Sequence, residues 1–174
     1  LPPEMERRVH VLSAPVDPSV EVPPRATREP GARPQVYWAG RFDRQKRVGL
    51  VFEIARRLPE VDLHMWGEEV LNRPDLAVPP DNVHLRGTYA DLGELDLGSA
   101  DAWLYTSGWD GVPSQLLEVA MTGVPLVGSL VGGTGEVLHR DLSRPVEAID
   151  DPAAYVEALR EVLADPDGAR DRAL

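Results

Sequence analysis

The segment 102–128 reads AWLYTSGWDGVPSQLLEVAMTGVPLVG and decides the fold. Its apolar run at 102–105 predicts a buried strand, residues 114–122 predict a helix, and residues 126–128 predict a second strand. A strand, a helix and a strand in this order are typical of a βαβ unit, whose two strands run parallel. The segment therefore predicts an α/β domain.

The same alternation of short apolar runs and helical patterns continues on both sides of this segment. Further strands are predicted at 36–39, 62–66, 83–86 and 144–149, and helices at 48–58, near 135–139 and at 152–164. Asp151 is the expected N-cap of the last of these helices, and Pro152 its first residue. The closing residues DPDGARDRAL predict the start of an unfinished helix. Together these elements predict three layers around a mainly parallel sheet of about six strands.

The first 34 residues have a different composition, because they hold eight of the 17 prolines. Such a stretch cannot form continuous regular structure. We expect a proline-rich lead-in at 1–34, with one short strand at 9–13 and an exposed connector at 23–34, followed by one domain at 35–174. Since the sequence also starts without Met, we expect a piece of a longer protein.

Charge and composition exclude several functional classes. With 18 Lys and Arg against 29 Asp and Glu, the formal net charge is −11, which argues against a nucleic-acid-binding protein. There is no cysteine, and the four histidines show no metal-ligand spacing, so no metal site is expected. No apolar run approaches membrane-spanning length. These features predict a cytoplasmic protein, although the full protein could still contact a membrane peripherally.

Open parallel sheets bind ligands beyond the carboxyl ends of their strands. The loops expected there are 40–47, 67–70, 87–90, 106–113 and 129–135. The first of them, GRFDRQKR, carries four basic residues, and Arg41 and Lys46 could neutralise a diphosphate. The alternative is a solvated basic loop before a helix.

The loop 106–113 and the helix after it carry a second set of polar residues. Gly111 lets the backbone approach a ligand, and Pro113 presets a helical turn whose free N–H groups attract an anion. Glu118 follows inside an almost wholly apolar helix, which we expect to be buried. A buried carboxylate needs partners such as sugar hydroxyls, whereas a Glu118 at the rim would merely be solvated. Gly132 and Gly133 form either a phosphate-binding loop or an ordinary glycine-rich turn.

These residues add up to a family pattern. Residues 35–166 resemble the C-terminal domain of retaining glycosyltransferases of the GT-B fold, the glycogen-synthase-like and mannosyltransferase-like group known as glycosyl transferases group 1. Three segments carry the resemblance in the family's order: AGRFDRQKRV at 39–48, TSGWDGVPSQLLEVAMTGVPLVGS at 106–129 and VGGTGEVL at 131–138. The resemblance implies a Rossmann-like domain at 35–174 that binds a nucleotide sugar, without metal or other cofactor.

The resemblance also implies roles for single residues. Arg41 and Lys46 would hold the donor diphosphate, Asp110 would contact hydroxyls of the transferred sugar, and Glu118 would bind the ribose hydroxyls. The remaining expected donor contacts are, in chain order, Gly40, Gly87, Thr88, Tyr89, Gly111, Gly132 and Gly133. Of these, Gly87, Thr88 and Tyr89 would meet the base, mainly through their backbone. The acceptor would bind to an N-terminal domain that this chain lacks.

Three departures from the family pattern leave alternatives open. The first acid of the pair is Asp110 rather than the commoner Glu, the glycine segment reads GGTGE, and HRDLSRPVEA replaces a glycine-containing stretch. One alternative is a degenerate homologue that acts as a non-catalytic nucleotide-sugar-binding or scaffold subunit. Another is a GT-B-fold epimerase, which the fit of the paired acids disfavours. The sequence does not indicate which base, sugar or acceptor is used.

Overall fold

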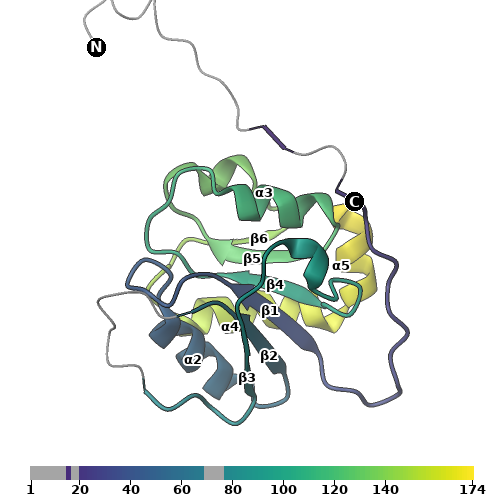
Figure 1. Cartoon of the computed structure of the whole chain (residues 1–174), viewed down its shortest axis with the longest axis horizontal. Helices are drawn as coiled ribbons and strands as arrows, with labels where there is room; N and C mark the ends of the chain where they lie inside the picture. The colour runs from purple at the N-terminus through teal and green to yellow at the C-terminus, as the bar shows by residue number, and fades with distance from the viewer. Residues whose placement is uncertain (1–14, 17–19, 69–76) are drawn as a thin grey trace, which may run out of the picture.

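The computed structural model describes residues 15–16, 20–68 and 77–174, so the strand predicted at 9–13 lies outside the described residues. Six strands form one sheet in the order β3-β2-β1-β4-β5-β6, and every neighbouring pair is parallel. Figure 1 shows them side by side across the middle of the molecule. The strands are β1 (Gln35–Ala39), β2 (Asp62–Trp66), β3 (Val83–Gly87), β4 (Ala102–Tyr105), β5 (Leu126–Ser129) and β6 (Arg144–Val146).

Four α-helices and two 3₁₀ helices connect and follow these strands. They are α2 (Val48–Arg57), η1 (Leu92–Glu94), α3 (Ser114–Met121), η2 (Gly132–Glu136), α4 (Pro152–Ala164) and α5 (Pro166–Ala173). The predicted bounds of β2, β4 and α4 are confirmed, and the Asp151 carboxylate caps α4 by accepting a hydrogen bond from the N–H of Ala153 at 2.9 Å. The short helix predicted near 135–139 is present as the 3₁₀ helix η2, which begins three residues earlier than predicted.

Two hydrophobic cores lie on the two faces of the sheet, because successive strand side chains point in opposite directions. Val36 and Trp38 of β1 face the core under α2, α4 and α5, whereas Tyr37 and Ala39 face the core under α3. Each core is a separate cluster of buried side chains. The three-layer α/β fold predicted from the sequence is therefore confirmed.

Residues 20–34 of the lead-in lie outside the sheet and are anchored at one buried carboxylate. Asp101 is fully buried and pairs with Arg28 at 3.1 Å and with Arg25. Its second oxygen accepts the N–H of Gln35 at 2.7 Å. The guanidinium of Arg170 in α5 donates to the carbonyl of Pro23 at 3.3 Å, so the lead-in passes close to the C-terminal end (Figure 1).

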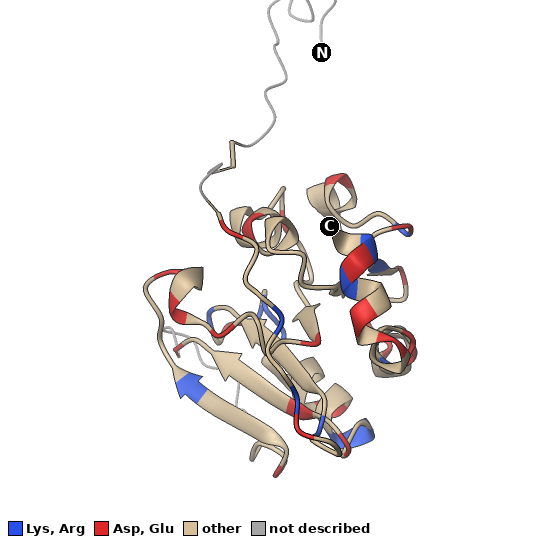
Figure 2. Ribbon diagram, turned by 90° about the vertical axis from the view of Figure 1, so that its right-hand side faces the viewer, with Lys and Arg blue, Asp and Glu red and all other residues tan. Residues whose placement is uncertain are grey.

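Charged residues are dispersed over the surface. Figure 2 shows short acidic and short basic stretches of the ribbon alternating along the described part of the chain. No helix in the described residues is both long and apolar enough to cross a bilayer.

Candidate functional site

A cavity of about 600 Å³ opens beyond the carboxyl ends of the strands, where the sequence predicts the ligand site. Four of the five predicted loops contribute to it, and the loop 129–135 does not. Its lining residues are Gly40, Arg41, Gln45, Lys46, Gly67, Glu68, Thr88, Tyr89, Ala90, Asp110, Pro113, Ser114 and Gln115. They come from loops after β1, β2, β3 and β4 and from the start of α3.

Close backbone approach brings the loops after β1 and β2 together. A Cβ atom on Gly67 would lie 1.9 Å from the carbonyl oxygen of Gly40, and Gly67 has a φ of +143°. The N–H of Gly67 donates to the carbonyl of Gly87 at 2.8 Å, which ties in the loop after β3 as well. Only glycine fits this contact, so Gly67 fixes the wall of the cavity between Gly40 and Gly87.

Lys46 and Asp110 meet in the wall of the cavity. Their Nζ and Oδ2 atoms lie 3.2 Å apart, and the two side chains are only 15% and 19% exposed. Tyr105, the last residue of β4, donates its hydroxyl to the same Asp110 oxygen, and its ring lies 4.8 Å from Lys46 Nζ. Two groups that lie 64 residues apart in the sequence thus form one ion pair.

The surroundings of Asp110 keep its carboxylate ionised. Burial alone would raise the pKa of Asp110, but the hydrogen bond from Tyr105 and the positive charge of Lys46 outweigh it and hold the pKa below its usual value. Burial, followed by the hydrogen bond to Asp110, raises the pKa of Tyr105. Asp110 is therefore an ionised acceptor at neutral pH, and Tyr105 is a protonated donor.

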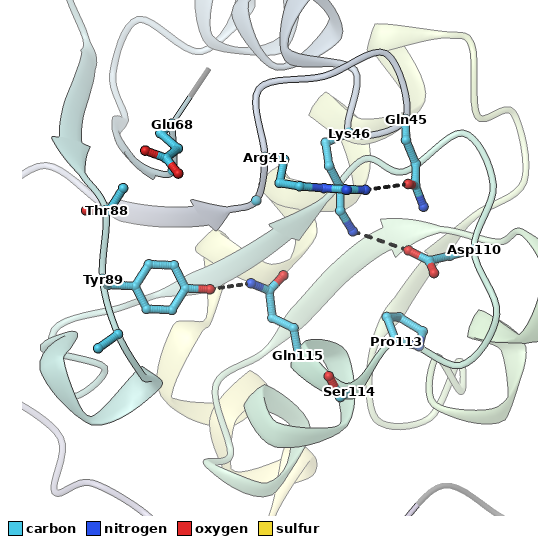
Figure 3. A pocket seen from close by; sticks show the side chains of 13 residues that line it. Arg41, Gln45, Lys46, Glu68, Thr88, Tyr89, Asp110, Pro113, Ser114 and Gln115 are labelled. Atoms are coloured by element: carbon cyan, nitrogen blue, oxygen red, sulfur yellow. Dashed lines mark hydrogen bonds and ion pairs between the residues drawn. The ribbon is translucent and has the colours of Figure 1, made fainter. Parts of the chain in front are cut away.

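Gln45 connects the basic loop to the loop that carries Asp110. Its side-chain amide donates to the carbonyl of Trp109 at 2.8 Å, and its amide oxygen accepts from the Arg41 guanidinium at 3.1 Å. Asp43 pairs with Arg41 from the other side at 3.2 Å. Figure 3 shows Arg41, Gln45 and Lys46 grouped at one side of the cavity, with Asp110 facing Lys46. The arrangement presents two cations to a ligand, and Arg41 is the more exposed of them.

The loop after β3 meets the beginning of α3 across the cavity. The Gln115 amide donates to the hydroxyl oxygen of Tyr89 at 2.6 Å (Figure 3). Of the three residues expected to meet the base, Thr88 and Tyr89 line the cavity and Gly87 is not among the lining residues. The φ of Gly87 is +78°, so this glycine turns the chain out of β3.

Glu118 lies outside this cavity. It lines a neighbouring cavity of about 550 Å³ together with residues of η1 and of the lead-in. The prediction that its helix is buried is wrong, because Leu116 and Val119 are the buried residues of α3 and Glu118 is half-buried. The helix forms an outer layer, so one side of it stays open to water.

Gly132 and Gly133 support the loop 110–112 and do not line the cavity. A Cβ atom on Gly132 would lie 1.9 Å from the carbonyl oxygen of Asp110, and one on Gly133 would lie 2.8 Å from Val112 Cγ2. Gly111 is also absent from the lining, although its N–H donates to the Asp110 carboxylate at 3.0 Å. These glycines therefore set the position of Asp110.

Sequence reasoning did not single out several residues of the site, among them Gln45, Gly67, Glu68, Tyr105 and Gln115. Tyr105 lies in a predicted apolar strand, and its position at the carboxyl end of that strand was a usable signal. Gln115 follows Pro113 in the first turn of a predicted helix. Its place directly after the loop 106–113 was therefore also a usable signal, because that loop lies at the carboxyl edge of the sheet. Glu68 lies in a predicted loop. Among the residues that the structure describes, no group of three or more His, Cys, Asp or Glu could hold a metal ion.

Comparisons with known proteins agree on one kind of relative. A family model described as "Glycosyl transferases group 1" matches residues 33–165. Glycogen synthase of Mycobacterium tuberculosis is 32% identical over 164 residues, which is 86% of this chain and 39% of that protein. The chain thus spans about two fifths of the length of the curated relatives it matches.

Solved structures share the fold. HepE from Anabaena, solved in complex with UDP and glucose, superposes with a TM-score of 0.72 at 16% identity, over 81% of this chain and 41% of that one. Sucrose-phosphate synthase from Thermosynechococcus elongatus gives a TM-score of 0.69 at 23% identity, over 83% of this chain and 41% of that one. The six-stranded parallel sheet is thus a half of the GT-B fold.

Proposed function

Because the chain belongs to the glycosyl transferases group 1 family, we propose that it is the donor-binding domain of a retaining glycosyltransferase. In this proposal the whole protein transfers a sugar from a nucleoside-diphosphate sugar to an acceptor, which is bound by an N-terminal domain. The observation that carries the proposal is the ion pair of Lys46 and Asp110 inside a cavity at the carboxyl edge of the sheet. The pair places a cation that can bind phosphate, Lys46, next to an anion that can accept hydrogen bonds from hydroxyl groups, Asp110.

Arg41 and Lys46 bind the diphosphate. A guanidinium and an ammonium that face the same cavity can neutralise oxygens of both phosphates. When the bond to the sugar breaks, negative charge builds up on the departing diphosphate, and fixed cations stabilise that charge. The proposal assigns this role to the two side chains without a metal ion.

Asp110 orients the transferred sugar. An ionised carboxylate accepts hydrogen bonds from sugar hydroxyls, and the lowered pKa keeps Asp110 in that form. Tyr105 and the loop held by Gly132 fix its position. Glu118, one helical turn after Ser114 at the start of α3, accepts hydrogen bonds from the ribose hydroxyls. The chain is thereby the donor half of an active site in a cytoplasmic enzyme.

The second candidate is a subunit that binds nucleotide sugar without transferring it. The observation that favours it is the saturation of one Asp110 oxygen, which accepts from both Lys46 and Tyr105. A sugar hydroxyl would have to use the other oxygen or displace one partner. Assay of the whole protein with a panel of sugar donors separates the candidates, because a scaffold subunit shows no turnover with any of them.

Binding of UDP, GDP and ADP by calorimetry tests the donor site. Arg41→Met should weaken the binding of the preferred nucleotide about 10- to 100-fold, because it removes charge-assisted hydrogen bonds to phosphate. Arg44→Met is the matched control: it removes the same charge from the same loop, but Arg44 does not line the cavity, so affinity should change little. Absence of binding at millimolar nucleotide, or equal losses in both variants, would contradict the proposal.

A further inference from the structure

Two cavities lie in a row along α3. The first, of about 600 Å³, holds Lys46 and Asp110, and the second, of about 550 Å³, holds Glu118. The loop after β3 follows the same course, since Thr88–Ala90 line the first cavity and Asp91–Gly93 line the second. The same helix and the same loop thus form walls of both cavities.

The hydrogen bond between Tyr89 and Gln115 stands at the boundary. Tyr89 comes from the loop and Gln115 from the first turn of α3, and their polar atoms meet at 2.6 Å across the space between the two walls. Figure 3 shows the two side chains reaching toward each other over the cavity. Glu118 follows Gln115 by three residues, so the two lie on neighbouring positions of one helix face.

This bridge leaves hydrogen-bonding capacity unused. The Gln115 Oε1 atom is buried and has no hydrogen-bond partner among the described residues. A buried acceptor without a donor is costly, so the closed bridge is less stable than a fully paired contact. Burial raises the pKa of Tyr89, the hydrogen bond with Gln115 opposes this rise, and the negative charge of Glu118 adds to it.

We propose that Tyr89 and Gln115 determine ligand specificity by dividing one elongated donor site, and that a nucleoside diphosphate separates them so that its ribose reaches Glu118. The inference rests on the proposed function, because it takes the first cavity as the diphosphate site. An inorganic diphosphate fits beside Lys46 with the bridge closed. A nucleoside diphosphate has to break the bridge, and its affinity is reduced by the free energy of that step.

The test compares two ligands on bridge variants of this chain. Tyr89→Phe keeps the aromatic ring and removes the hydroxyl, and Gln115→Leu keeps the approximate volume and removes the amide. Each variant should bind the preferred nucleoside diphosphate about two- to tenfold more tightly than the native chain, the range expected for one hydrogen bond. Pyrophosphate affinity should stay the same. The double variant should gain no more than either single variant, because both changes break the same bond.

The variant Glu118→Gln tests whether the ribose reaches the second cavity. It should weaken nucleoside diphosphate binding in the native chain and in Tyr89→Phe, and leave pyrophosphate binding unchanged. If Gln115→Leu does not fold, Tyr89→Phe alone decides, since its ring and packing are intact. The inference that the bridge divides the site is overturned if Tyr89→Phe binds the nucleotide no more tightly than the native chain. It is also overturned if the variant gains equal affinity for both ligands. Either result leaves the proposed donor site in place. Absence of binding of either ligand to any variant overturns the proposed function, and the inference with it.

Discussion

Gly132 determines where the Asp110 carboxylate lies, although it does not line the cavity. Its φ is +52°, and an added Cβ atom would meet the carbonyl oxygen of Asp110 at 1.9 Å. Both conditions exclude other residues unless the backbone moves. A motif residue that looks like a ligand contact in the sequence therefore lies outside the cavity and supports a residue that lines it.

Gly132→Ala should lower the free energy of unfolding by about 2 kcal/mol, because it introduces both a strained φ and a backbone clash. It should also weaken binding of a nucleotide sugar more than binding of the free nucleoside diphosphate, since Asp110 is displaced. Urea denaturation and calorimetry measure the two effects. Gly135→Ala is the control in the same turn: its Cβ would lie 3.4 Å from Leu130 Cδ1, an ordinary contact. If the two variants were equally stable, the close approach of Gly132 to the Asp110 carbonyl would not determine stability at this position.

At the scale of elements, the lead-in is fastened to the domain by charge. Asp101 is fully buried at the start of β4, and its partners Arg25 and Arg28 both come from the lead-in. A buried carboxylate is tolerated only when it is paired, so the domain depends on the lead-in for that pairing. Residues 20–34 are thus part of the folded unit, although they form no regular structure.

Replacement of both Arg25 and Arg28 by Met should destabilise the domain by about 3 kcal/mol or more, because the buried Asp101 charge keeps only its hydrogen bond from Gln35. Thermal and urea unfolding measure the loss, and proteolysis should cut the lead-in faster. The control is Asp167→Asn, which removes an Arg25 partner that is 82% exposed. Exposed pairs contribute little, so this variant should unfold like the native chain. A double variant as stable as the control would refute the anchoring role.

At the scale of the whole molecule, one histidine links stability to pH. His64 of β2 is 7% exposed, its Nδ1 atom accepts from Arg86 Nε at 2.9 Å, and its Nε2 atom meets the amide oxygen of Gln35. Burial, with the charge of Arg86, lowers the pKa of His64 to about 4 from its usual 6.5. The folded state therefore holds His64 neutral where the unfolded state protonates it.

Folding stability should fall as the pH drops from about 6.5 toward 4, because only the unfolded state takes up the proton in that window. Above 6.5 both states are neutral, and the contribution of His64 is fully present. Melting temperatures between pH 7 and 5 measure the slope. His64→Gln should flatten this slope, because it removes the group that takes up the proton only in the unfolded state. Parallel slopes for native chain and His64→Gln would contradict the assignment.

The sequence by itself determined the order and type of the main elements and the edge of the sheet where the cavity lies. Apolar runs such as 62–66 and 102–105 specify strands through local periodicity, and the carboxyl ends of parallel strands meet at one edge whatever the details. The location of Arg41 and Lys46 at that edge followed from their place after β1. These features depend on neighbours in the chain, so a single sequence contains them.

Only the tertiary structure decided which side chains meet. The contact of Lys46 with Asp110, the bridge from Tyr89 to Gln115 and the placing of Glu118 in a second cavity all join residues of different loops. Their distances depend on strand order and on close contacts such as Gly67 with Gly40, which no local pattern encodes. Burial of α3 was misjudged for the same reason, because an apolar helix in an outer layer is covered on one side only.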